Sequence, residues 1–207
     1  MRLTALLVLG SLECLVAAPL FAQPVGCGDW YHPFGPLDYR TATPEQRVLV
    51  ERVHFTQSVE SLTKGRSGSI GGDLRYTLRA FPNHPRALIA MSNLFRKTRP
   101  GIPADVELSL ECWFARAIDF RPEDSRVRVV YGVELLKDGH KKEAIEQLNV
   151  ANDLAGDDAN VHYNLGLAFF DLHDYDKSLE HAKRAYELGF PLPGLRDKLK
   201  RAGKWQE

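Results

Sequence analysis

SRVRVVYGVELLKDGHKKEAIEQLNVANDLAGDD (residues 125–158) is followed without a gap by ANVHYNLGLAFFDLHDYDKSLEHAKRAYELGFPL (residues 159–192). A shift of 34 positions places Gly132 on Gly166 and Ala151 on Ala185, and large apolar residues again fall on large apolar residues. Small residues at fixed positions let two helices approach closely where they cross. This period therefore predicts two consecutive helical hairpins, and such hairpins must stack because neither can bury both of its apolar faces alone.

The residues at these positions resemble the tetratricopeptide repeat family. The second segment has the large-small pair Leu165-Gly166 in its first helix, the turn Asp174-Tyr175, and the small residue Ser178 in its second helix. The resemblance implies an all-α solenoid of helical hairpins. It also implies that the first helix of each hairpin lines a concave face that binds other proteins.

Two less regular units precede this pair. Residues 85–124 form a stretched repeat, with helices expected at 85–97 and 106–120 and a long loop that contains Pro100 and Pro103. Residues 44–82 form a degenerate hairpin with helices expected at 44–63 and 73–81, and residues 193–207 add a capping helix at 195–202 and a tail. Helical spacing in the first of these helices predicts the apolar positions Val48, Val50, Val53, Phe55, Val59 and Leu62.

Residues 1–22 have the layout of a secretory signal peptide. A positive start at Arg2 precedes an almost wholly apolar stretch, and a small residue, Ala22, ends it. We expect cleavage after Ala22 and export to the bacterial periplasm or envelope. An uncleaved membrane anchor is the alternative, but Glu13 shortens the apolar stretch below the ~20 residues that a span requires.

Residues 23–43 form an irregular segment rich in Gly, Pro and aromatic residues, which we expect to pack on the first hairpins. Its Cys27 and the distant Cys112 are the two cysteines that remain after signal cleavage, and an even pair in an oxidising compartment predicts a disulfide. Closing so long a loop stabilises by roughly 4–5 kcal/mol in the chain-entropy estimate. Two free thiols and lipidation of Cys27 stay open as alternatives.

Composition and motifs indicate no catalytic, metal-binding or nucleic-acid-binding site. Lys plus Arg and Asp plus Glu both number 27, so the basic excess typical of nucleic-acid binding is missing. The histidines follow no metal-ligand spacing, and the Ser67–Ser69 stretch lacks the Gly-Lys-Ser/Thr of a phosphate loop, so we expect no cofactor, no metal and no catalytic residue. A thiol or other enzyme that uses Cys27 with His32 is the alternative.

The remaining candidate is a binding surface. Asn and Arg side chains on concave helices can hydrogen-bond a peptide backbone or a carboxylate. Leu167 and Phe170 are assigned equally to the core or to the groove. We expect a non-enzymatic scaffold or adaptor with a protein or peptide partner, and no integral membrane segment after signal cleavage. The candidate partner-binding residues are Arg86, Asn93, Arg96, Arg126, Lys137, Asn160 and Tyr163.

Overall fold

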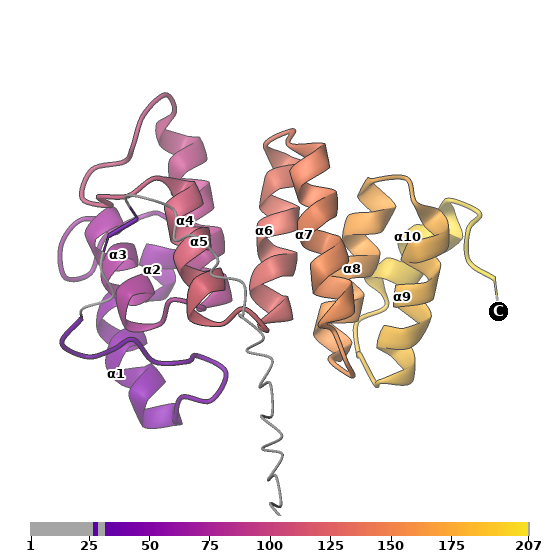
Figure 1. Ribbon diagram of the computed structural model, residues 1–207, viewed down its shortest axis with the longest axis horizontal. Coiled ribbons are helices and arrows are strands. Elements are labelled where there is room, and N and C mark those ends of the chain that lie inside the picture. The colour runs from indigo at the N-terminus through magenta and orange to yellow at the C-terminus, as the bar shows by residue number, and fades with distance from the viewer. Residues whose placement is uncertain (1–26, 29–31, 207) are drawn as a thin grey trace, which may run out of the picture.

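The computed structural model describes residues 27–28 and 32–206, and these residues hold ten helices and no strand. The helices follow one another as a row of hairpins, which Figure 1 shows from the N-terminal units to the C-terminal ones. The predicted all-α helical-repeat solenoid is confirmed. The helices are α1 (Pro44–His54), α2 (Gln57–Glu60), α3 (Ile70–Ala80), α4 (Pro85–Thr98), α5 (Leu110–Phe120), α6 (Ser125–Lys137), α7 (Lys141–Asp153), α8 (Ala159–Asp171), α9 (Tyr175–Glu187) and α10 (Gly194–Arg201).

Close helix crossings build the two C-terminal hairpins, α6–α7 and α8–α9. A Cβ atom at Gly132 would lie 2.7 Å from Cγ of Leu148, so only glycine lets α7 approach α6 this closely. In the next hairpin the hydroxyl of Ser178 donates a hydrogen bond to the carbonyl of Gly166 at 2.8 Å. The small residues therefore lie where the helices cross, as their spacing predicts.

The turns of the two repeats share a backbone conformation but differ in sequence. Gly139 ends the first turn with φ +84°, and His173, the residue 34 positions later, adopts φ +63°. Asp174 then caps α9 by accepting a hydrogen bond from the backbone N–H of Lys177. The second turn therefore keeps the left-handed backbone conformation although a histidine replaces the glycine.

The N-terminal hairpins depart from the expected helix bounds. The helix predicted at 44–63 ends at His54, because Phe55 turns into the core and packs 4.6 Å from the buried ring of His84. Val48 and Val53 consequently lie on the outer face of α1, whereas Val50 is buried on its inner face. The loop before α5 is also longer than expected, and Val106 is buried within it instead of starting the helix.

The segment before α1 packs against the first hairpins. Phe34, Leu37 and Tyr39 surround buried Phe81 at the end of α3, and the N–H of Leu37 donates to the carbonyl of Ala80 at 2.8 Å. Asp38 is buried and accepts hydrogen bonds from Asn83 and Arg121. Trp30 and Tyr31 lie outside the described residues.

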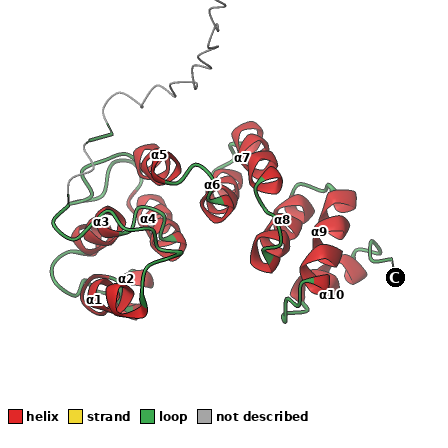
Figure 2. Ribbon diagram, turned by 60° about the horizontal axis from the view of Figure 1, so that its bottom comes forward, coloured by secondary structure: helices red, strands yellow, loops and turns green. Residues whose placement is uncertain are grey.

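The C-terminal end is closed by α10. Leu195 and Leu199 are fully buried and form one cluster with Ala182 of α9, while the remaining face of α10 is polar. Figure 2 shows α10 lying against α8 and α9 at the end of the row. The predicted capping helix is therefore present.

Candidate functional site

A hollow of about 580 Å³ runs across the first helices of three consecutive hairpins, α4, α6 and α8. We call it the groove. Its floor is aliphatic and its rim is polar. The lining residues are Pro85, Arg86, Ile89, Arg126, Val129, Val130, Val133, Glu134, Lys137, Asn160, Val161 and Asn164.

Four of the seven candidate residues meet in this groove: Arg86, Arg126, Lys137 and Asn160. They come together because each lies on the same side of a first helix, and consecutive first helices stack next to one another. They were chosen from the resemblance, which places the first helix of each hairpin on one concave face.

The other three candidates lie elsewhere. Asn93 and Arg96 are further along α4, where the guanidinium of Arg96 donates to the side-chain oxygen of Asn93 at 2.7 Å. Tyr163 turns toward the C-terminal end, where its ring stacks on Phe190 with centroids 4.0 Å apart. Phe170 packs around the same α10 cluster as Tyr163.

A second hollow of about 650 Å³ adjoins the groove and shares Val133, Lys137 and Asn164 with it. Leu136, Leu167 and Leu172 are among its apolar lining residues. Leu167 thus lines a hollow with one part of its side chain and packs around the α10 cluster with another. The apolar surface open to a partner therefore extends from α4 to the turn after α8.

The cations of the groove are paired with carboxylates of their own helix or of a neighbouring segment. Arg126 lies 2.6 Å from Asp158, and the side chain of Lys137 donates to Glu134 at 2.8 Å. Arg86 pairs with Glu60, and this hydrogen bond raises the pKa of the guanidinium above its ordinary value. The pairs of Arg86 and Arg126 are solvent-accessible and are each worth about 0–1 kcal/mol, so a ligand carboxylate can exchange with them at low cost, whereas Glu134 is buried.

Two asparagines on α8 carry the free hydrogen-bonding capacity of the groove. Asn160 and Asn164 are one helical turn apart, and both are exposed. The side-chain N–H of Asn164 donates to the backbone carbonyl of Asn160 at 2.8 Å. Among the described residues the side-chain amide of Asn160 and the side-chain oxygen of Asn164 have no hydrogen-bond partner. An amide can donate to one peptide group and accept from another, so this pair suits an extended backbone.

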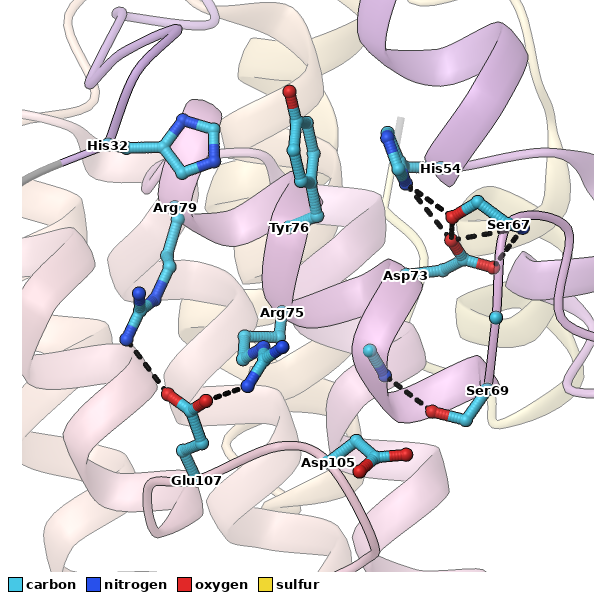
Figure 3. Close-up of a pocket in the computed structure, with 12 residues that line it drawn as sticks. His32, His54, Ser67, Ser69, Asp73, Arg75, Tyr76, Arg79, Asp105 and Glu107 are labelled. Atoms are coloured by element: carbon cyan, nitrogen blue, oxygen red, sulfur yellow. Dashed lines mark hydrogen bonds and ion pairs between the residues drawn. The ribbon is translucent and has the colours of Figure 1, made fainter.

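A separate polar hollow of about 430 Å³ lies beside α3, and Figure 3 shows its lining. The buried carboxylate of Asp73 accepts hydrogen bonds from the backbone N–H groups of Arg66 and Ser67 at 2.6 and 3.1 Å. His54 Nδ1 lies 3.0 Å from the same carboxylate. Burial alone would raise the pKa of Asp73, but these hydrogen bonds and that of the Ser67 hydroxyl hold it below its ordinary value.

The serine, histidine and aspartate of this hollow do not form a catalytic relay. In a relay the hydroxyl meets one imidazole nitrogen and the carboxylate meets the other. Here Ser67 Oγ lies 2.9 Å from His54 Nδ1, the nitrogen that also faces Asp73. Arg75 and Arg79 are both paired with Glu107. The hollow is therefore a set of mutually satisfied charges that fastens the loop at residues 62–69 to α3.

The two cysteines meet at the far side of this region. Their sulfur atoms are 2.07 Å apart, within bonding distance, and the guanidinium of Arg116 donates to the backbone carbonyl of Cys27 at 3.1 Å. His32, which the enzyme alternative pairs with Cys27, instead packs edge-on against Tyr76 with centroids 4.6 Å apart. Within the described part of the chain, no three His, Cys, Asp or Glu side chains are grouped to hold a metal ion.

Comparison with known proteins gives one match. Residues 159–189, which form the α8–α9 hairpin, match the family model of the tetratricopeptide repeat. This repeat is typical of scaffolds that bind other proteins. No curated protein and no solved structure matches the chain. None of the helices at 32–206 combines the length and apolar character needed to cross a bilayer.

Proposed function

We propose that this chain is a non-enzymatic scaffold of the bacterial periplasm or envelope that holds an extended segment of another protein in the groove. The observation that carries the proposal is the pair Asn160 and Asn164. The side-chain amide of Asn160 and the side-chain oxygen of Asn164 have no hydrogen-bond partner among the described residues, and both side chains line the groove together with Ile89, Val129 and Val133. Backbone groups of the partner bind the amides, and its apolar side chains bind the floor.

The charges of the rim favour a segment with at least one carboxylate. Arg86 and Arg126 lie at the edge of the groove, on different helices, and each is paired with a partly exposed acid of its own chain. A carboxylate of the partner can take the place of Glu60 or Asp158, which are then solvated. The exchange costs little because exposed ion pairs contribute little to stability.

Export is the second part of the proposal. It rests on the layout of residues 1–22, which lie outside the described residues, and on the bonding distance between Cys27 and Cys112. A disulfide persists in the periplasm but is rare in the reducing cytosol. Intact mass of the protein from its native compartment tests this part: we expect a chain that begins at Gln23 and has no free thiol. A chain that retains residues 1–22, or two titratable thiols, contradicts it.

Binding of peptides tests the groove. A display library of linear peptides is selected on the oxidised protein, and the dissociation constants of the selected peptides are measured by fluorescence anisotropy. Asn160→Ala combined with Asn164→Ala removes two side-chain amides that can hydrogen-bond the peptide backbone. The double variant is therefore expected to weaken binding by at least about tenfold. The matched control is Asn152→Ala, an exposed asparagine on α7 outside the groove, which leaves affinity unchanged.

Two results contradict the proposed site. One is a set of selected peptides whose affinity is the same for the double variant and for the unaltered protein. The other is equal weakening by the control on α7, which would indicate a different surface. Increasing salt is expected to weaken the carboxylate-bearing peptides more than neutral ones, because only they exchange with the ion pairs of the rim.

A further inference from the structure

The outer face of α1 exposes three aliphatic side chains. Val48, Leu49 and Val53 retain 54%, 53% and 36% of their surface. In Figure 2, α1 and α2 lie at one end of the row of helices. Aliphatic side chains gathered on one helix face usually mark a contact surface, whereas single exposed ones need no explanation.

The opposite face of α1 is firmly held, so the exposed face has a fixed orientation. Val50 is buried, and Glu51 accepts a hydrogen bond from the hydroxyl of Tyr39 at 2.8 Å. The guanidinium of Arg47 lies over the ring of Tyr39, 4.8 Å from its centroid. The helix therefore cannot roll to bury Val48 and Leu49 without breaking these contacts.

One acid and one base frame the aliphatic strip. Glu45 lies three residues before Val48, and Arg52 lies three residues after Leu49. The separation of seven positions between Glu45 and Arg52 corresponds to about two turns, so both side chains project from the same face, ~10 Å apart along the axis. Both are exposed, and neither has an ion-pair partner in the described part of the chain.

We propose that this strip binds the same strip of a second copy of the chain, with the two α1 helices antiparallel about a two-fold axis between Val48 and Leu49. That single axis places Val48 against Leu49 of the second copy. It also places Glu45 against Arg52 of the second copy, at both ends of the contact. The surface is thus complementary to itself, which an isologous dimer requires.

The charge pattern favours this occupant over others. Glu45 and Arg52 cancel in charge, so the strip gives an anionic membrane surface no net attraction, and a parallel helix pair would place like charges beside each other. An antiparallel copy satisfies both charges and covers all three aliphatic residues. The strip of one helix is smaller than the interface of a tight dimer, so the association is reversible and depends on concentration.

Sedimentation equilibrium of the full chain over a range of concentrations tests the proposal, and we expect a monomer–dimer equilibrium. Leu49→Lys, which removes apolar contact at the axis from both copies, is expected to raise the dissociation constant by about tenfold or more. The matched control is Val150→Lys, at an exposed valine on α7, which leaves the equilibrium unchanged. Circular dichroism confirms that each variant retains its helices.

Two charge reversals test the antiparallel arrangement. Glu45→Lys alone and Arg52→Glu alone each place like charges together in the homodimer, so each weakens it. An equimolar mixture of these two variants restores the dimer, because the reversed charges are complementary across the same axis. No effect within one chain would produce this recovery on mixing.

Three outcomes overturn the proposal: a chain that stays monomeric at every concentration, a dimer indifferent to Leu49→Lys, and failure of the mixed variants to recover. A monomer would assign the strip to another occupant, such as the first residues of the chain or a different protein. The groove on α4, α6 and α8 is not part of this contact. The test of peptide binding and the test of dimerisation therefore have independent outcomes.

Discussion

Acidification is expected to destabilise the C-terminal hairpin through the buried histidine His181. His162 on α8 and His181 on α9 place their Nδ1 atoms 3.0 Å apart. His162 Nε2 lies 2.9 Å from the backbone carbonyl of Gly156, which can only accept, so Nε2 carries the hydrogen. Neutral His162 therefore presents a lone pair at Nδ1, and His181 donates its Nδ1 hydrogen to it. A further proton on His181 would go to its Nε2 and would place a charge on a buried ring.

The magnitude follows from the pKa of His181. Burial lowers it from 6.5 to about 4, with help from the neighbouring charges of His162 and Lys177. The unfolded chain therefore binds more protons than the folded one between these pH values, and stability rises with pH. A difference between 6.5 and about 4 corresponds to about 3 kcal/mol, present in full above pH 6.5 and lost progressively as the pH falls to about 4.

Urea denaturation followed by circular dichroism, between about pH 7.5 and pH 4.5, measures this loss. His181→Asn keeps an amide N–H near the position of Nδ1 but cannot titrate, so its free energy of unfolding falls less on acidification. The control is His173→Asn at the exposed turn before α9, where asparagine tolerates the positive φ. The reasoning is refuted if His181→Asn and the unaltered protein lose the same free energy over this pH range.

Three further perturbations have expected outcomes. Gly132→Ala places a methyl group against Leu148 and is expected to cost about 1–3 kcal/mol in urea denaturation, whereas Gly68→Ala, with open space around it, is expected to be nearly neutral; equal effects would contradict the close crossing. Reduction of Cys27 and Cys112, separated by 85 residues, is expected to lower stability by up to roughly 4–5 kcal/mol, and an unchanged denaturation curve in reductant would argue against the bond. Asp73→Ala removes the acceptor of two backbone N–H groups, so hydrogen exchange at Arg66 and Ser67 is expected to accelerate, and unchanged protection there would show that the loop is held by other contacts.

The early end of α1 shows where a prediction from the local sequence pattern fails. No glycine or proline interrupts the sequence between His54 and Gln57, so a periodic pattern continues through Phe55. The chain turns there because the Phe55 ring packs against His84, a residue that follows the second helix of the same unit. The same break leaves Val48 and Val53 on the outer face of α1, which apolar character alone would place inside.

The candidate site also combines features that the sequence predicted with features that it did not. Arg86, Arg126, Lys137 and Asn160 were chosen from the resemblance to the repeat family, which places the first helix of each hairpin on one face, and the structure brings these four together in the groove. Their ion pairs were not predictable from the sequence, because Arg86 and Arg126 bind acids 26 and 32 positions away. Tyr163 has the same helical position as a groove residue, yet the chain after α9 brings Phe190 onto its ring.

The polar hollow beside α3 was beyond the reach of sequence patterns altogether. Its groups come from the segment before α1, the end of α1, the loop before α3, α3 itself and the loop before α5. Serine and glycine in residues 67–72 are typical of a linker, and nothing in that composition indicates that Asp73 gathers the loop around a buried carboxylate.

Sequence by itself determined the hairpins of the C-terminal half, because helix formation and close crossing depend on residues at fixed, short separations such as Gly132 and Leu148. It also determined which first helices form the groove. Tertiary structure alone decided which charges are paired, which way Tyr163 turns, and which apolar face of α1 remains uncovered. Those outcomes depend on contacts between segments far apart in the chain, and their energies are set by burial and geometry that no local pattern records.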